Sequence, residues 1–348
     1  MRPLPGNRYS GWGDLVSERA DRMKVAVLRA LQEIDGAAGA ARIVQQLAGA
    51  GVSLKPRTVR LYLKQLDREG MTECVSRRLG RRITDRGVEE LAHANVVEKV
   101  GFIATKVDSL GYRMSFNCKA GEGSIIVNVT MIDERVLGMA LKEMKSVFAA
   151  GLGMGGRLIA AESGRVIGGL TVPPGRVGIG TVCSVTVNGI LLHEGIPVTS
   201  RFGGLLEMRG GQAVRFIELI EYSGTTLDPL EAFIRAGMTN VRACAASGAG
   251  IIGASFREIP SAAIEDAMKL QKAMRRKGLG GIMAIGQPNK PLLDVPVAEG
   301  RTGVIVVGGL NPVAALHEAG IRISMLSLAG LEDYRAFKDC EELCRKYA

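Results

Sequence analysis

The sequence predicts an N-terminal winged helix, mostly α with a β wing, followed by an α/β domain built of two homologous halves. Three observations lead to this fold class. A basic N-terminal stretch has helix and hairpin signals in the order of a winged helix. Near Val100 the charge falls, and glycine, valine and isoleucine become more frequent. The chain after that point repeats itself at an offset of about 125 residues.

Length and composition set the domain count. The 348 residues are too many for one ordinary core, and 47% hydrophobic with 23% charged residues is typical of a globular protein. We expect a flexible N-terminus over residues 1–20, a winged helix over 21–95 and a second domain over 100–348. The halves of the second domain are expected at about 100–223 and 224–348. Because the sequence contains neither a long apolar run nor a signal segment, we expect a cytoplasmic protein.

Three helices are predicted before the wing. Asp21 is the expected N-cap of the first helix, which ends at Gly36, and the second ends near Gly49. Ser53 is the expected N-cap of the third helix, which has Pro56 in its first turn. The short connection between the second and third helices is typical of a helix-turn-helix.

The third helix has a basic face opposite its apolar one. Arg57, Arg60 and Lys64 are spaced at i, i+3 and i+7, so they share one exposed stripe. Lys55 and Thr58 lie near the start of the helix. We favour Arg57, Thr58 and Arg60 as base-reading residues, because the first residues of a recognition helix reach base edges.

A basic hairpin follows. Residues 72–75 and 82–84 are expected to pair as short strands around a tip that contains three arginines. Up to Asn95 the chain holds 17 Lys+Arg against 11 Asp+Glu, a net of +6. A solvated charged helix would explain the stripe alone, but stripe, helix spacing and wing together predict DNA binding. The predicted contacts are Lys55, Arg57, Thr58, Arg60, Lys64, Arg77, Arg78 and Arg81.

The second domain contains an internal repeat. NGILLHEGI at 188–196 matches NPVAALHEAGI at 311–321, and Cys118-Lys119-Ala120 matches Cys244-Ala245-Ala246. We expect mixed strands with covering helices in each half, and two similar halves that pack about a pseudo-twofold axis. The cleft between such halves is a usual place for a small ligand.

Several motifs resemble catalytic sites but have simpler interpretations. GLGMGG at 151–156 follows a predicted helix, so a helix C-cap is favoured over a dinucleotide loop. His193-Glu194 and His317-Glu318 recur in both halves, which favours capping or packing over catalysis. The six cysteines are scattered without a C-x-x-C pair, so buried thiols are expected, with no metal site and no disulfide framework. We therefore expect that the protein is not an enzyme and binds no cofactor.

Two segments are the best candidates for a ligand site. TVCSVTVNG at 181–189 and RACAASGAG at 242–250 are rich in small and hydroxyl residues. Loops of this kind expose N–H and hydroxyl groups that suit a carboxylate, and an arginine adds a forked pair. A tightly packed turn is the alternative interpretation. The candidate ligand-binding residues are Cys183, Ser184, Thr186, Arg201, Arg242, Cys244, Ser247, Gly248 and Arg257.

The chain also resembles a known family. The stretches that carry the resemblance are RIVQQLAGAG, PRTVRLYLKQLDREG and RRITDRG in the first domain, and GIGTVCSVTVNGILLHEGIPV, FGGLLEMRGG and NVRACAASGAGIIGASFREIP in the second. They are similar to NrpR, the nitrogen-responsive transcriptional repressors of methanogens and related prokaryotes. The resemblance covers most of the chain.

The resemblance implies a homodimer that binds a palindromic operator of nitrogen-assimilation genes and releases it when 2-oxoglutarate binds the effector domain. It also implies that the Cys183 and Cys244 segments belong to the inducer site. Some members carry two effector domains after the winged helix, whereas this chain has one, which leaves its assembly open. Two alternatives remain: a regulator that senses a different metabolite, and an enzyme that uses the cleft between the halves.

Overall fold

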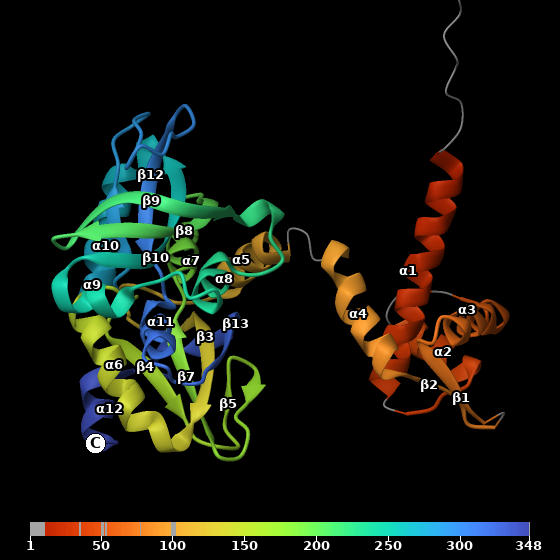
Figure 1. Cartoon of the computed structure of the whole chain (residues 1–348). Helices are drawn as coiled ribbons and strands as arrows, with labels where there is room; N and C mark the ends of the chain where they lie inside the picture. Colours follow the sequence, from red (N-terminus) through yellow and green to blue (C-terminus); the bar gives the residue numbers. More distant parts are fainter. Residues whose placement is uncertain are drawn as a thin grey trace, which may run out of the picture. The chain divides into compact units, whose positions relative to one another are not determined.

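The computed structural model divides the chain into two compact units, Met1–Lys99 and Val100–Ala348, which are considered separately (Figure 1). It describes residues 11–34, 36–49, 52, 54–76, 78–98 and 102–347. No helix in these ranges is long and apolar enough to cross a membrane.

The first unit has the element order of a winged helix. Its elements are α1 (Gly11–Ile34), α2 (Ala40–Gly49), α3 (Pro56–Arg68), β1 (Thr72–Ser76), β2 (Gly80–Ile83) and α4 (Asp85–Glu98). Leu28 and Leu31 of α1 are buried together with Ile43 of α2 and with Leu63 and Leu66 of α3. The apolar faces predicted for the three helices therefore form one core, and the predicted winged-helix fold is confirmed.

The start of the first helix was predicted wrongly. The helix begins at Gly11, ten residues before the expected N-cap Asp21, so residues 11–20 are not a flexible terminus. Leu15, Glu18 and Ala20 have high helix propensity, and no proline interrupts the segment, so the helix continues through it. The expected N-cap Ser53 lies outside the described residues.

The second unit is α/β, as predicted. Its helices are α5 (Phe102–Arg113), α6 (Leu137–Ala149), α7 (Thr186–His193), α8 (Pro229–Arg235), α9 (Val241–Ser247), α10 (Ile264–Arg276), α11 (Asn311–Glu318) and α12 (Cys340–Lys346). Four short 3-10 turns are η1 (Glu134–Val136), η2 (Tyr222–Gly224), η3 (Ser261–Ala263) and η4 (Tyr334–Ala336). Its strands are β3 (Ser124–Asp133), β4 (Arg157–Ala161), β5 (Val166–Ile167), β6 (Leu170–Thr171), β7 (Arg176–Val182), β8 (Thr199–Arg209), β9 (Gln212–Glu221), β10 (Gly250–Pro260), β11 (Ile282–Ile285), β12 (Arg301–Val307), β13 (Ser324–Asp333) and β14 (Lys338–Asp339).

The two halves exchange strands. One five-stranded sheet has the order β13-β3-β7-β4-β14, and the other has the order β11-β12-β10-β8-β9 (Figure 1). Strands β13 and β14 of the second half thus complete the sheet of the first half, and β8 and β9 of the first half complete the sheet of the second. The two homologous halves interlock, and neither sheet consists of strands from one half alone.

The pairing differs from the mixed strands that we expected. Every strand pair between described residues is antiparallel. The continuous apolar run of β12 is buried over most of its length, as a strand covered on both faces must be. A continuous apolar run shows that both faces of a strand are buried, and it is commonest in parallel sheets. It does not by itself determine the direction of the neighbouring strands, which here are antiparallel.

Matched hydrogen bonds at the first residues of two corresponding helices reflect the repeat. Asn311 at the start of α11 accepts from the N–H of Gly253 at 2.8 Å and donates to its carbonyl at 2.9 Å. Thr186 at the start of α7 makes the corresponding pair with Ile126, at 3.3 and 3.4 Å. Each side chain ties the beginning of a helix to the first long strand of its own half.

The Gly-Leu-Gly segments are helix ends, as predicted. Gly151 follows α6 with φ +71°, and Gly278 follows α10 with φ +76°. A side chain with a Cβ rarely adopts this left-handed conformation, so glycine is favoured at both places. The segment 151–156 therefore ends a helix and is not a dinucleotide loop.

Candidate functional site

The basic stripe of α3 lies opposite its buried face. Val59, Leu63 and Leu66 are buried, and Pro56 occupies the first turn, where its missing N–H costs nothing. Arg57 and Arg60 are exposed. Lys64 and Lys55 are exposed as well, whereas Thr58 is half-buried. Three cations on one exposed helical face can contact phosphates or base edges.

The wing has a more specific structure than the sequence indicated. β1 pairs with β2, and Ala38 adds a bridge to Arg81 with N–O distances of 2.8 and 3.0 Å. Gly80 has φ +94°, and a Cβ there would lie 2.2 Å from the Ala38 carbonyl oxygen, so this close approach requires glycine. Arg78 is exposed near the tip, and Arg77 lies outside the described residues.

Arg81, a predicted DNA contact, forms an ion pair within the winged helix. Its Nε donates to Oδ2 of Asp67 at 2.7 Å, and both side chains are about three-quarters buried. Asp67 also accepts from the hydroxyl of Thr72 at 2.7 Å. Arg81 therefore ties the wing to the end of α3. It still lines a cleft of about 420 Å³ together with Arg60 and Cys74.

The nine candidate ligand residues do not form one site. Cys183, Ser184 and Arg257 converge in a buried cluster. Thr186 is buried near them, but its hydroxyl bonds the backbone of Ile126, which is a structural role. The remaining candidates lie elsewhere: Arg201, Arg242, Cys244, Ser247 and Gly248.

Arg257 is the most unusual side chain in the second unit. It lies on β10 beside a β-bulge, and only 1% of its surface is exposed. Its Nη2 donates to Ser184 Oγ at 3.4 Å, whereas Nε and Nη1 have no hydrogen-bond partner among the residues that the structure describes. Burial lowers the pKa of Arg257, while the nearby Tyr222, Cys183 and Asp228 raise it. A buried guanidinium with two unused donors is suited to a carboxylate.

Asp228 is a buried acid that affects the pKa of Arg257 and was not among the predicted site residues. Asp228 is 6% exposed and accepts from the N–H groups of Leu230 and Glu231 at 3.0 and 3.1 Å, so it caps α8. Burial raises the pKa of Asp228 to about 6. The charge of Glu231 raises the pKa as well, whereas its two backbone hydrogen bonds and Arg257 lower it. An aspartate before Pro229 is a typical helix start, which would have predicted the cap but not the burial.

Two further groups of the cluster are neutral. Burial raises the pKa of the Cys183 thiol to about 12, and burial also raises the pKa of Tyr222. Cys183 therefore remains a thiol near neutral pH, and a thiol is a poor nucleophile. The predicted burial of a cysteine is confirmed at this position.

Lys106 approaches the same cluster from α5. Burial lowers its pKa, whereas Cys183, Glu231 and Asp228 raise it. Lys106 also lines a surface cleft of about 570 Å³. Other parts of the wall are Arg113, the Gly168-Gly169 turn and residues 329–331. Cys183 and Asp228 thus affect the pKa of both cations, of which Lys106 lines an open cleft and Arg257 is buried.

The Cys244 segment is a helix and not the loop that we expected. Val241–Ser247 form α9, and Gly248 ends it with φ +75°. Glu318 accepts from the N–H groups of Val241 and Arg242, both at 2.8 Å, so the free N–H groups at this helix start are already used. Small residues favoured a loop in the sequence, but alanine is also the best helix former.

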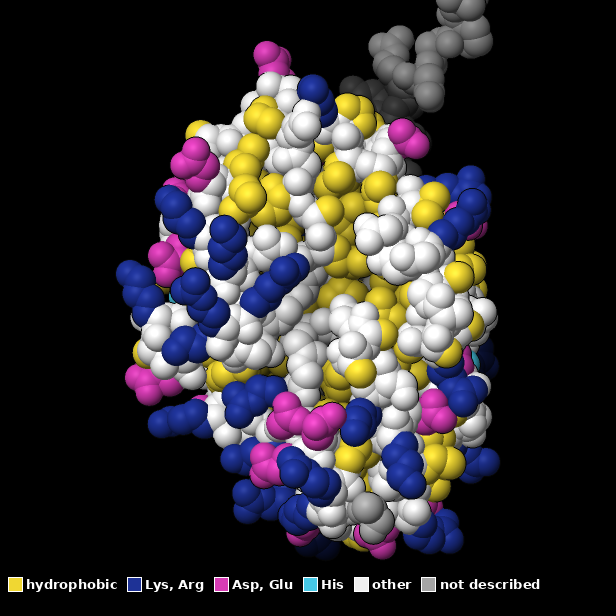
Figure 2. All heavy atoms as spheres, turned by 90° about the vertical axis from the view of Figure 1, so that its left-hand side faces the viewer, with side chains coloured by type: hydrophobic (Ala, Val, Ile, Leu, Met, Phe, Trp, Pro, Cys, Tyr) yellow, Lys and Arg dark blue, Asp and Glu magenta, His cyan; other side chains and the backbone are white. Residues whose placement is uncertain are grey.

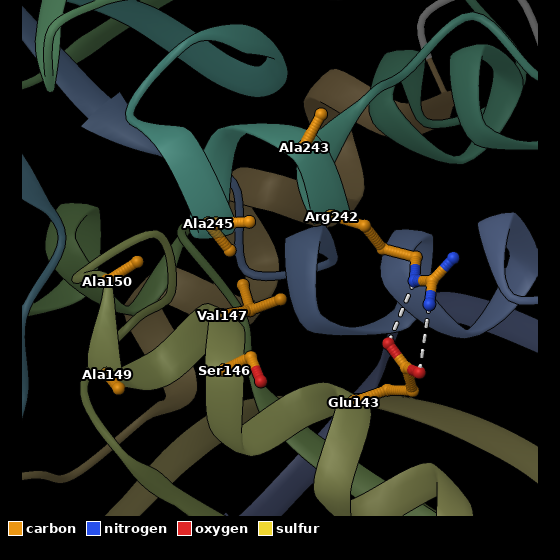
Figure 3. A pocket seen from close by; sticks show the side chains of 9 residues that line it. Glu143, Ser146, Val147, Ala149, Ala150, Arg242, Ala243 and Ala245 are labelled. Atoms are coloured by element: carbon orange, nitrogen blue, oxygen red, sulfur yellow. Dashed lines mark hydrogen bonds and ion pairs between the residues drawn. The ribbon is translucent and has the colours of Figure 1, made fainter.

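A groove of about 770 Å³ lies between α6 and α9. Figure 3 shows Arg242 of α9 reaching Glu143 of α6, with alanines along the groove. The Arg242–Glu143 distances are 2.9 and 3.1 Å, so the charge of this arginine is already compensated. On the face that Figure 2 presents, hydrophobic side chains gather in the middle and Lys and Arg surround them. Arg201 is likewise paired, with Glu258.

The possible metal ligands, the cysteines and the repeated His-Glu pairs can be located in the described part of the chain. No group of three or more His, Cys, Asp or Glu side chains is arranged to hold a metal ion there. Four of the six cysteines are buried, Cys344 is half-buried and Cys74 is exposed on β1, which is an exception to the expected burial. Glu318 caps α9, in agreement with the capping role expected for the repeated His-Glu pairs.

Family models match both units. The model described as NrpR regulatory domains NRD1 and 2 matches residues 100–339. A second model, described as the Ribonuclease R winged-helix domain, matches residues 25–91.

Two similar proteins and one solved structure are named as nitrogen regulators or as similar to one. The "Global nitrogen regulator NrpRI" of Methanosarcina mazei is 32% identical over 93% of this chain and 100% of its own length. The "Global nitrogen regulator NrpR" of Methanococcus maripaludis is 29% identical over 89% of this chain, which spans 54% of that relative. The crystal structure of a nitrogen repressor-like protein from Methanococcus jannaschii is also similar, with a TM-score of 0.58 and 28% sequence identity. The match covers 68% of this chain and 97% of the chain in that structure. These names are those of regulators and not of enzymes, and the chain belongs to the NrpR family of nitrogen regulators.

Proposed function

We propose that this chain is a nitrogen-responsive transcriptional repressor that binds a palindromic operator as a homodimer and releases it when 2-oxoglutarate binds the second unit. Membership of the NrpR family supports nitrogen regulation. Such a repressor acts in the cytoplasm, where the chromosome lies.

The exposed basic residues of the winged helix support DNA binding. One exposed face of α3 carries Arg57, Arg60 and Lys64, and no ion pair within the described residues neutralises these side chains. A recognition helix of this kind enters the major groove while other cations hold phosphates. A dimer would present two such helices to the two halves of a palindrome.

One observation carries the ligand assignment: Arg257 is buried with Nε and Nη1 unpartnered. A carboxylate accepts charge-assisted hydrogen bonds from a guanidinium, and such bonds are about twice as strong as neutral ones. 2-Oxoglutarate has two carboxylates, and Lys106, whose pKa is affected by Cys183 and Asp228 of the same cluster, would supply a second cation. We therefore favour the Arg257 cluster over the α9 segment as the inducer site.

Thermodynamics limits how the ligand acts. It can weaken DNA binding only by its different affinities for the free and DNA-bound forms. Arg257 and Ser184 belong to opposite halves, and the halves share both sheets. Ser184 follows a strand of one sheet and Arg257 lies on a strand of the other, so a ligand held between them would shift one sheet against the other. Such a shift would change the spacing of the two winged helices in the dimer.

Titration calorimetry of the full chain with 2-oxoglutarate tests the ligand assignment. We expect saturable binding, with weaker binding of glutarate, which lacks the keto group. Ser247→Leu in α9 should leave the affinity unchanged, since this residue lies outside the Arg257 cluster. Absence of binding at millimolar 2-oxoglutarate would contradict the inducer. Loss of binding in Ser247→Leu would move the site to α9, and preference for another anion would identify a regulator of a different metabolite.

A further inference from the structure

One large apolar side chain lies in the basic face of α3. Leu61 is 56% exposed, whereas Val59 and Leu63 of the same helix are buried. Among the described residues, Leu61 belongs neither to the core of the winged helix nor to the side chains packed against that core. Its side chain therefore contributes little to the folding of this unit, and it leaves apolar surface in contact with water.

Leu61 occupies the outermost position of the helix. An α-helix has 3.6 residues per turn, so each residue is turned by about 100° from the one before it. Val59 and Leu63, two residues before and two residues after Leu61, therefore lie almost opposite to it. Both of these side chains are buried. Leu61 thus points away from the core, at the centre of the exposed face of α3.

Cations surround Leu61 on this face. Residues three, four or seven positions apart on a helix share one face, and the residues at these distances from Leu61 include Arg57, Lys64 and Arg68. All three cations are exposed. A second copy of this face would place cations against cations, and like charges across an interface are unfavourable. The surface therefore fits a polyanion that also presents apolar groups better than it fits a second copy of this chain.

The major groove of DNA presents such an apolar group, the C5 methyl of thymine. Apolar side chains contact this methyl group, whereas arginine and lysine pair with guanine or hold phosphates. A helical side chain covers the turn that precedes its own Cα, so Leu61 covers the turn that contains Arg57 and Thr58. This turn belongs to the N-terminal part of α3, which is the part of a recognition helix that reaches base edges.

We propose that Leu61 contacts the C5 methyl group of a thymine in each half of the operator and so determines which base is accepted at that position. This inference rests on the proposed function, because it assumes that α3 enters the major groove. It goes further by assigning one base and one functional group to a named side chain. Cations that hold phosphates supply affinity for any sequence, whereas the leucine supplies discrimination between thymine and the other bases.

Deoxyuridine removes this methyl group alone, because it pairs with adenine as thymidine does. The operator is selected from random DNA with the full chain, and each thymidine is then replaced in turn by deoxyuridine at the symmetric positions of both halves. Fluorescence anisotropy measures the affinity of the full chain for each DNA. We expect one pair of positions at which the dissociation constant rises about fourfold for each half-site, which is the size expected for the burial of one methyl group.

Leu61→Ala is the decisive variant. Alanine is the best helix former and Leu61 lies outside the core, so α3 should be retained. This variant should bind the operator with thymidine and the operator with deoxyuridine equally well, because it lacks the contact with the methyl group. Leu79→Ala is the matched control, since Leu79 is 57% exposed but lies in the wing, between β1 and β2. The control should keep the full sensitivity to the loss of the methyl group.

The outcomes separate the two proposals. If the full chain binds no DNA, the DNA-binding part of the proposed function fails. If it binds an operator but no replacement of thymidine weakens binding, DNA binding stands and the role of Leu61 is refuted. The same conclusion follows if Leu61→Ala shows the loss that the unaltered chain shows. Light scattering provides a second readout, since a changed mass of Leu61→Ala with an unchanged response to deoxyuridine would assign Leu61 to a protein contact instead.

Discussion

Arg257 Nη2 donates to Ser184 Oγ at 3.4 Å, and this is its one side-chain hydrogen bond within the described part of the chain. Arg257 lies on β10 of the second half, and Ser184 precedes α7 of the first. The contact joins the two halves through a guanidinium that retains two unused donors. The proposed inducer site therefore lies where residues of the two halves meet.

Arg257→Met should abolish the response to inducer. Methionine has a similar length and no charge, so the carboxylate loses its forked partner. The loss of one member of a buried charge pair costs about 2–5 kcal/mol of binding free energy. Calorimetric titration with 2-oxoglutarate measures this change. Arg201→Met, which removes an arginine already paired with Glu258, is the control. Equal losses in both variants would contradict the assignment.

Arg60→Ala should weaken DNA binding by about 1–3 kcal/mol if Arg60 reads a base. If Arg60 holds a phosphate, the loss should be the same for all DNA sequences and the salt dependence should decrease. Fluorescence anisotropy with operator and unrelated DNA distinguishes the two roles. Arg276→Ala on α10 removes the same charge from the second unit and serves as control. Unchanged affinity in the Arg57→Ala, Arg60→Ala double variant would exclude α3 from the interface.

Asn311→Ala should destabilise the second unit by about 3 kcal/mol, because it leaves buried backbone groups without partners. Asn311 bonds Gly253 twice and donates to the Leu152 carbonyl at 3.0 Å. Thr186→Val, at the equivalent position, removes longer hydrogen bonds and should cost less. Chemical unfolding followed by circular dichroism compares them. A larger loss in Thr186→Val would refute the ranking.

Asp228→Asn should stabilise the chain above pH 6 and have little effect near pH 4. The folded-state pKa of Asp228, about 6, lies above its ordinary value of 3.8. The folded chain therefore holds this proton more tightly, and ionisation above pH 6 costs stability that is regained as the pH falls towards 4. A shift of about two units corresponds to about 3 kcal/mol. Unfolding free energies of both chains across this range test the sign, and a variant less stable at pH 8 would contradict it.

The full chain should be a dimer at micromolar concentration, since a winged helix that reads one half-site gains affinity from a twofold partner. Light scattering measures the mass. We expect the dimer contacts to lie in the second unit, so a fragment that contains only the winged helix should be a monomer. A monomeric full chain that still binds a palindrome tightly would oppose this assembly.

Much of the fold was predictable because it follows from local patterns. The three helices, the hairpin and the repeat each have a sequence period or match, and Arg257 was among the nine candidate ligand residues. The exchange of β8 and β13 was not predictable, because strand partners far apart in sequence leave no local signal. Asp228 was missed for a similar reason: Asp-Pro marks a helix start, whereas its burial beside Arg257 depends on tertiary packing.

The most direct test of the account is the affinity of the full chain for its operator, selected from a pool of random DNA, without and with millimolar 2-oxoglutarate. We predict that the ligand weakens operator binding about 5–150-fold, which corresponds to a coupling free energy of about 1–3 kcal/mol. The Arg257→Met variant should bind the same operator with an affinity that does not change when 2-oxoglutarate is added. An operator affinity that does not change with saturating 2-oxoglutarate in the unaltered chain would contradict the account.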